Sequence, residues 1–355
     1  MGILQIFDKG LVGLDIGVSG IKAVELSTGK ARRLMAYNRI PLPFNAISPD
    51  GEIKDRAVVV SALKTLFGSK EFTTTKVATA GFGNSIITKK IQVDRMKPED
   101  LREQIYWEAE QYIPFDVNDV NLDFAILGSS GTQPANKMDV LLVAAKKDYI
   151  QMLNDVLEEA GLQVEAIDTQ PFALGNSFEF NYSHLVDTSG GATCVLVDFG
   201  AGSTKISVFE GDRTTFNREV RQCGLSCSLM LSERLGVSLA EGENLKIKDS
   251  QNRSVAAVLE EFNGLLTDEV ARAVEFSMTQ STDTALDGVY ICGGASRTPG
   301  LLEMLGKKLS APVKALNPVQ NVAGSGKRMN AQAIKEMMYL GTVAIGLALR
   351  SGGGK

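Results

Sequence analysis

Residues 11–26 read LVGLDIGVSGIKAVEL, and this stretch decides the fold. An apolar run reaches Asp15, then Gly17 and Gly20 follow among small residues, and a second apolar run begins. The pattern predicts a buried strand, a tight turn and a second strand. Because glycine has no Cβ, the backbone N–H groups of such a turn can converge on an anion such as phosphate. For a single stretch of this kind, a plain surface hairpin is the commoner explanation.

The same pattern returns at residues 195–210, VLVDFGAGSTKISVFE. Asp198 follows Asp15 by 183 residues, so each half of the chain carries one copy. Two related hairpins that face one another would hold a nucleotide from both sides. The two aspartates stand near strand ends, where a carboxylate suits a hydrated Mg²⁺ beside phosphates. The repeat therefore predicts a phosphate site built by duplication.

A third element lies at residues 288–302, GVYICGGASRTPGLL. A strand is expected up to Cys292, a glycine pair breaks it, and Pro299 is expected to open the next helix near its first turn. A glycine pair at such a corner lets a flat base and ribose lie against bare backbone, although by itself it is merely a turn. The residues that would line one side of a base are Gly293, Gly294, Ala295 and Ser296.

Hairpin, hairpin and glycine corner, in this order, resemble the actin/Hsp70/FtsA nucleotide-binding superfamily through nearly the whole chain. The resemblance implies an α/β protein with the actin-like ATPase fold, in which two related lobes enclose Mg²⁺ and ATP. The first hairpin matches D-x-G-x-x-x-x-K, and the second matches D-x-G-x-G-[ST]-T. The implied phosphate-binding residues are Gly17, Val18, Ser19, Gly20 and Lys22 in the first hairpin, and Gly200, Ala201, Gly202, Ser203 and Thr204 in the second.

The same resemblance assigns roles to single side chains. Asp15 and Asp198 would organise Mg²⁺ through water, and Lys22 would reach the phosphates as a point charge; a solvated surface lysine is the alternative for Lys22. Gln170 occupies the position that orients water, and because an amide does not accept a proton as a carboxylate does, hydrolysis is expected to be slow. Asp168 is an alternative base, although a helix cap is the more ordinary role for it.

Glu243 and Lys246 lie three residues apart on one expected helical face. They match an E-x-x-K helix that contacts ribose and base in members of the superfamily. A surface ion pair, nearly neutral in its effect on stability, is the competing explanation.

The order of elements predicts the domain organisation. The first lobe is expected at residues 1–80 and 161–187, and a small α+β subdomain, inserted as in FtsA, at 81–160. The second lobe is expected at 188–355, with a subdomain at about 238–286 and a final helix from Ala331 completing it. A length of 355 residues is enough for two or more domains that each bury a core.

The segment YWEAEQYIPFDVNDVNLDFAIL, residues 106–127, is very similar to the PilM family of type IV pilus assembly proteins. The resemblance implies that the cytoplasmic N-terminal tail of PilN docks in a groove between the first lobe and the inserted subdomain. Pilus motor ATPases and the platform protein are further implied partners. Two explanations are considered for Trp107: its side chain packs against a neighbouring strand, or it is an exposed anchor for a partner. The other functions considered are an FtsA-type filament-forming division protein and a sugar or metabolite kinase.

Composition limits the function further. The net charge is −5, so nothing suggests a nucleic-acid-binding surface. No apolar run reaches roughly 18 residues, and no basic amphipathic helix of the FtsA type closes the sequence, so membrane contact is expected only through partners. The four cysteines lack metal-type spacing and are expected to be reduced, as in a cytosolic protein. The protein is therefore expected in the cytoplasm, peripheral at the inner membrane through its partners.

Overall fold

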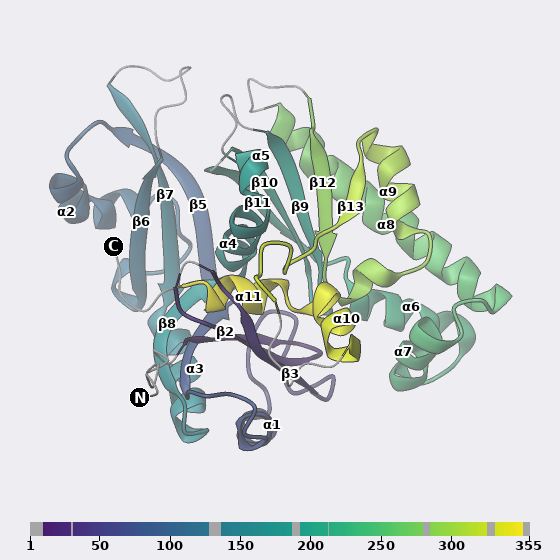
Figure 1. The fold of residues 1–355 in the computed structure, drawn as a ribbon. Coiled ribbons are helices and arrows are strands. Elements are labelled where there is room, and N and C mark those ends of the chain that lie inside the picture. The colour runs from purple at the N-terminus through teal and green to yellow at the C-terminus, as the bar shows by residue number, and fades with distance from the viewer. Residues whose placement is uncertain are drawn as a thin grey trace.

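The computed structural model describes residues 10–29, 31–127, 136–186, 192–211, 213–279, 285–324 and 331–350. Within these residues the strands form three sheets. The first sheet has the order β3 (Leu34–Pro41), β2 (Gly20–Leu26), β1 (Val12–Gly17), β4 (Lys76–Gly81), β8 (Gln163–Thr169). The second has the order β11 (Arg213–Val220), β10 (Thr204–Glu210), β9 (Thr193–Phe199), β12 (Gly288–Cys292), β13 (Val313–Ala315). Figure 1 shows how the two sheets are placed.

The first two sheets have the same topology. In each, a meander of three antiparallel strands is followed on its other side by two parallel strands. The register also agrees, because Asp15 lies opposite Lys22 in β1–β2, and Asp198 lies opposite Lys205 in β9–β10. The predicted duplication is therefore present in strand order, strand direction and register.

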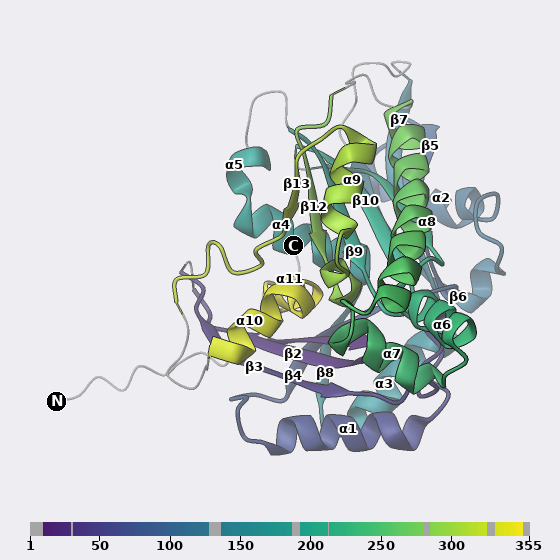
Figure 2. The ribbon, with the colours of Figure 1, turned by 90° about the vertical axis from the view of Figure 1, so that its right-hand side faces the viewer.

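Helices cover both faces of the first sheet. On one face, α1 (Arg56–Gly68) and α3 (Lys147–Glu159) bury apolar side chains such as Leu63 and Val156 against β1 and β4. On the other face lie α4 (Gln170–Asn181) and α11 (Thr342–Ala348). In Figure 2, α1 lies below the first sheet and α11 above it.

The approach of α11 to the first sheet depends on glycine. A Cβ at Gly13 would lie 1.9 Å from the carbonyl oxygen of Ala344, and a Cβ at Gly346 would lie 1.7 Å from that of Ala173. The backbone of α11 is therefore in direct contact with the backbones of β1 and α4. Assigning the whole C-terminal region to the second lobe was wrong for this segment, because α11 packs on β1, β2 and α4.

The second sheet is covered in a similar way. On one face, α6 (Gly224–Leu235), α8 (Arg253–Met278) and α9 (Leu301–Leu309) bury Leu231, Phe262 and Leu305. On the other face, α4 contributes Leu174 and Phe178, followed by α5 (Ser183–Val186). Helix α4 thus packs against both sheets. Around this core lie α7 (Leu239–Lys248) and the 3₁₀ helix η2 (Gly294–Arg297), whereas α10 (Ala331–Leu340) buries Met337 in a cluster with β2, β3 and α11.

The third sheet has the order β5 (Ile86–Asp94), β7 (Lys137–Lys146), β6 (Val120–Leu127) and forms the sheet of the expected inserted α+β unit. Extending that unit to residue 160 was wrong, because α3 packs Val156 and Leu157 against the first sheet. Helix α2 (Pro98–Ala109) packs Leu101 and Ile105 against it, and η1 (Val117–Asp119) precedes β6. The Trp107 side chain points away from this core and is 72% exposed. Of the two explanations for Trp107, packing against a strand is therefore wrong.

Candidate functional site

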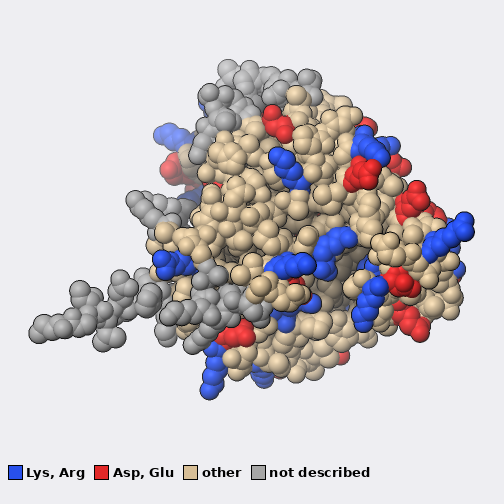
Figure 3. Space-filling model, turned by 45° about the vertical axis from the view of Figure 1, so that its right-hand side comes forward, with Lys and Arg blue, Asp and Glu red and all other residues tan. Residues whose placement is uncertain are grey.

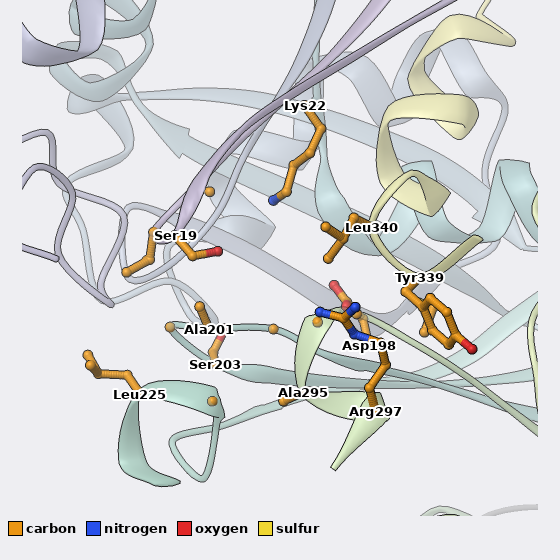
Figure 4. Close-up of a pocket in the computed structure, with 18 of the residues that line it drawn as sticks. Ser19, Lys22, Asp198, Ala201, Ser203, Leu225, Ala295, Arg297, Tyr339 and Leu340 are labelled. Atoms are coloured by element: carbon orange, nitrogen blue, oxygen red, sulfur yellow. The ribbon is translucent and has the colours of Figure 1, made fainter. Parts of the chain in front are cut away.

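A cavity of about 530 Å³ lies where the two hairpins meet. Its walls come from both sheets, from α6 and α7, and from the end of α10 and the start of α11. In Figure 4, Lys22 points into this space from one side and Asp198 from the other. The predicted residues that line it are Asp15, Gly17, Val18, Ser19, Lys22, Gln170, Asp198, Gly200, Ala201, Gly202, Ser203, Glu243, Lys246, Gly293, Gly294 and Ala295.

The first hairpin places a buried carboxylate at the bottom of the cavity. Asp15 is 5% exposed, and its carboxylate accepts a hydrogen bond from Lys22 Nζ at 2.9 Å and another from Gln170 Nε2 at 3.1 Å. Gln170 is brought there because β8 passes directly into α4, whose first turn is capped by the Thr169 hydroxyl at 3.4 Å from the Phe172 nitrogen. Asp15 on β1, Lys22 on β2 and Gln170 on α4 thus form one cluster, although α4 is far from the hairpin in sequence.

The second hairpin repeats the acid but arranges it differently. No described residue donates a hydrogen bond to the Asp198 carboxylate, whereas Lys205 Nζ donates to Ser203 Oγ at 3.0 Å. Burial raises the pKa of Asp198 above its usual range, and the nearby Lys205 ammonium opposes that rise. A carboxylate without a direct partner at the wall of a cavity is available to bind a hydrated cation.

The turns of the two hairpins touch each other. A Cβ at Gly202 would lie 2.5 Å from Cγ2 of Val18 and 3.3 Å from Cα of Pro49, so only glycine fits there without displacement. A Cβ at Gly17 would lie 3.0 Å from Lys22 Nζ. The glycines therefore let the two lobes close over the cavity and leave backbone facing it.

The Glu243–Lys246 pair on α7 is a partly buried network and not a surface ion pair. The Lys246 side chain is 12% exposed, and its Nζ binds Glu243, the Gly224 carbonyl oxygen at 2.9 Å and Ser228 Oγ at 2.9 Å. Ser228 Oγ also binds Glu243. The network ties α7 to the first turn of α6, which lines the cavity.

The glycine corner after β12 requires glycine at its first position. Gly293 has φ +87°, and a Cβ there would lie 2.4 Å from Asp198 Oδ1 and 2.5 Å from the Phe199 carbonyl oxygen. Its N–H donates to the Tyr339 carbonyl oxygen at 2.9 Å, and the Arg297 guanidinium lies 5.5 Å from the Tyr339 ring centroid. This corner gives the cavity a wall of bare backbone next to Asp198 of the second hairpin.

Three of the predicted residues do not line the cavity. Gly20 packs against the backbone of Ile40 and Pro41, the Thr204 hydroxyl donates to the Gln222 carbonyl oxygen at 2.6 Å, and Ser296 donates to the Gly293 carbonyl oxygen at 2.7 Å.

Asp168 likewise does not reach the cavity. It pairs with Arg350 after α11, while Thr169 provides the helix cap, so neither role considered for Asp168 is present.

Several residues of the cavity were missed from the sequence. Lys205 had a signal that could have found it, since it follows Lys22 by the same 183 residues that separate the two aspartates. Arg39, Tyr339 and Leu340 had none, because strand pairing brings Arg39 there and the packing of α10 brings the other two. Arg297 follows the glycine corner within the quoted stretch.

The cavity is basic although the chain is acidic overall. Its basic side chains are Lys22, Arg39, Lys205, Lys246 and Arg297, and its acidic ones are Asp15, Asp198 and Glu243. Figure 3 shows Lys and Arg side chains around the hollow in the middle of this face. In a protein with net charge −5, a local excess of cations favours an anionic ligand.

A second cavity, of about 270 Å³, lies where the inserted sheet, α4 and the second sheet meet. Leu127 and Leu141 come from the inserted sheet, Phe172 and Glu179 from α4, and Phe209 from β10. Its walls are mainly apolar side chains with a few polar groups.

Comparison with known proteins identifies the family. The family model for type IV pilus assembly protein PilM matches residues 13–352. The chain belongs to the PilM family. A solved structure of a PilM-PilN type IV pilus biogenesis complex matches with a TM-score of 0.86 at 27% identity, covering 97% of this chain and 99% of that chain.

Two members of another family are more distant. The ethanolamine utilization protein EutJ from Carboxydothermus hydrogenoformans matches at 18% identity, over 96% of this chain and 89% of that chain, with a TM-score of 0.57, which shows a shared fold alone. EutJ of Escherichia coli (strain K12) is 25% identical over 157 residues, 44% of this chain and 49% of the relative, so the match spans about half of that relative's length. The chain has the actin-like ATPase fold.

Among the helices that the structure describes, none has the length and apolar character to cross a membrane. In the same part of the chain, no three His, Cys, Asp or Glu side chains gather where they could hold a metal ion directly.

Proposed function

We propose that this chain binds Mg²⁺ and ATP in the larger cavity and acts as a nucleotide-dependent assembly protein of the type IV pilus machinery. The observation that carries the proposal is the convergence of two equivalent hairpins, one from each lobe, on one basic cavity. Mg²⁺, supplied with ATP, would neutralise part of the phosphate charge.

The residues present fit such a ligand. Positions without Cβ at Gly17 and Gly202 leave backbone facing the phosphates, and Lys22 supplies a cation. Asp15 and Asp198 would hold the hydrated metal ion through its water ligands. Gly293, Gly294 and Ala295 would lie along one side of the base, and Glu243 with Lys246 along the ribose.

Gln170 is the candidate for orienting water. Its amide is fixed by the hydrogen bond to Asp15, and a glutamine amide directs a water molecule without accepting its proton. Besides Asp15 and Asp198, the described carboxylate that lines the cavity is Glu243, which is engaged by Ser228 and Lys246. We therefore expect ATP to be hydrolysed slowly and to serve mainly as a clamp between the lobes.

The smaller cavity is our candidate for the docking of a PilN tail. It lies between the inserted sheet and α4, where the sequence resemblance places the groove, and its apolar walls suit Leu or Ile side chains of an extended peptide. The match to the PilM-PilN complex supports PilN as the partner. Docking on PilN would bring the chain to the inner membrane; contacts with motor ATPases and the platform protein stay predictions.

Nucleotide binding is tested by titration calorimetry with Mg·ATP. Asp198→Asn removes the free carboxylate with little change of shape, so we expect the affinity for Mg·ATP to fall at least tenfold while ATP without a divalent ion binds as before. Asp139→Asn is the matched control, since that carboxylate is also buried, at 5% exposure, but pairs with Lys90 in the inserted sheet. Equal Mg·ATP affinity in both variants and the wild type would remove the assignment.

Docking of the tail is tested with a synthetic PilN N-terminal peptide. Leu127 and Ile126 are neighbours on β6, so their side chains point to opposite faces of the inserted sheet. Leu127 lines the smaller cavity, whereas Ile126 is 41% exposed and does not line it. We expect Leu127→Asp to abolish peptide binding and Ile126→Asp to leave it within twofold. The reverse order of effects would move the docking site to the α2 side of the sheet.

A further inference from the structure

The internal duplication gives the chain a second lysine at a position equivalent to Lys22. Lys205 follows Lys22 by 183 residues, and each lysine lies directly opposite the aspartate of its hairpin. Both side chains are largely buried, 14% exposed for Lys22 and 9% for Lys205, and both line the larger cavity. Two equivalent cations therefore face the same space from the two lobes.

The two lysines differ in their partners. Lys22 Nζ is engaged by Asp15 at 2.9 Å, as a direct ion pair. Lys205 Nζ makes no such bond to Asp198; it donates to the Ser203 hydroxyl at 3.0 Å and lies 4.0 Å from Glu219, whose side chain is 39% exposed. The Phe82 ring, 5.7 Å away, covers another side of the ammonium group.

This arrangement leaves hydrogen-bonding capacity at Lys205. An ammonium group has three N–H donors, and here one neutral hydroxyl accepts at hydrogen-bonding distance. A buried charge with so few acceptors is costly unless an anion completes its surroundings. Ser203 belongs to the turn of the second hairpin, so the ammonium is held beside the backbone that faces the cavity.

We propose that Lys205 is a second phosphate-binding lysine, which grips the phosphate chain of the nucleotide from the lobe opposite Lys22. The inference rests on the proposed nucleotide binding and names a residue of that same site. The Ser203 hydroxyl acts as a positioning group that keeps the ammonium in place before the ligand arrives. A pair of lysines on opposite lobes also links phosphate binding to the closed arrangement of the lobes.

The test measures binding constants for ATP, ADP and adenosine on the full chain by calorimetry. Lys205→Met removes the charge and keeps a long apolar side chain against Phe82. We expect this change to weaken the binding of ATP and ADP by about 10- to 100-fold, which is the effect of losing one charge-assisted hydrogen bond. The affinity for adenosine should stay within twofold of the wild type. Lys205→Arg, which retains the charge, should recover most of the loss. Lys54→Met, at a 52% exposed lysine, is the control and should change nothing.

A second measurement uses the wild-type chain, so that it does not depend on how a variant folds. Acylation of lysines by an activated ester, read by mass spectrometry, should slow at Lys205 with ATP and not with adenosine. If the wild type binds ATP but Lys205→Met keeps that affinity, or ATP gives Lys205 no protection, the lysine assignment is wrong while nucleotide binding stands. If the wild type binds no nucleotide at all, the proposed function and this inference both fail.

Discussion

Replacing Gly293 by alanine should damage both stability and nucleotide binding, whereas the same change at the next residue should not. Gly293 has φ +87° and ψ 160°, a conformation that residues with a Cβ almost never adopt. The added methyl group would meet Asp198 Oδ1 at 2.4 Å and the Phe199 carbonyl oxygen at 2.5 Å. At Gly294, by contrast, it would meet only the end of a flexible side chain, Leu340 Cδ2, at 3.3 Å.

The magnitude follows from two terms. The strained backbone conformation costs about 1–3 kcal/mol, and moving the corner by about 1 Å to relieve the two contacts costs a further 1–3 kcal/mol or so. Together they lower the free energy of unfolding by roughly 2–6 kcal/mol for Gly293→Ala. For Gly294→Ala we expect a change below about 1 kcal/mol, because a leucine side chain can rotate away.

The assay is urea unfolding of the two variants side by side, followed by calorimetry with Mg·ATP. With a slope near 3 kcal/mol per molar urea, Gly293→Ala should lower the midpoint by about 1 M. Its ATP affinity should fall at least tenfold, because the displaced corner also holds the Tyr339 carbonyl oxygen through the Gly293 N–H. If Gly293→Ala and Gly294→Ala unfold at the same urea concentration, the close packing of this corner against β9 is not as described.

Three further results are expected. Burial raises the pKa of Cys194 and of Cys227 to about 11 from 9.0, so the contribution of these two thiols to the free energy of unfolding should be constant below pH 9 and fall between pH 9 and 11; urea midpoints that stay flat between pH 9 and 11 would contradict this. Gly346→Ala should lower the free energy of unfolding by about 3 kcal/mol or more, because its Cβ would lie 1.7 Å from the Ala173 carbonyl oxygen. A soluble variant with an unchanged urea midpoint would show that α11 does not pack this closely against α4. Trp107, the single tryptophan and 72% exposed, should be quenched by acrylamide nearly as well as free indole, and strong protection would mean that a partner or second copy covers it.

The parts of the fold that depend on local sequence could be predicted. Strand, turn and strand follow one another within each hairpin, so an apolar run, a glycine turn and a second apolar run were enough to find β1–β2 and β9–β10. The glycine corner after β12 was predicted for the same reason. The equivalence of the two sheets followed from the repeat and is confirmed by their strand order.

The parts that depend on distant packing could not be predicted. The sequence of α11 is an ordinary apolar segment, and nothing local shows that it returns to the first sheet. The small residues Gly13 and Gly346 permit the contact, but they do not indicate which element each one packs against. Thr204 illustrates the opposite error. It lies within the matched motif, yet the alternation of a strand turns its side chain to the Gln222 carbonyl and away from the cavity.

Helix α4 is the element by which the two cavities would influence each other. Its first residue, Gln170, is bonded to Asp15 in the larger cavity, and Glu179, near its other end, lines the smaller one. A helix of 12 residues spans about 18 Å as a stiff rod, and this one is buried against the first sheet through Ala173 and against the second through Leu174 and Phe178. Any rearrangement at Asp15 that moves Gln170 must therefore shift the wall of the smaller cavity. Such coupling is reciprocal. If nucleotide in the larger cavity changes the affinity for a peptide in the smaller one by some factor, the peptide must change the affinity for nucleotide by that same factor.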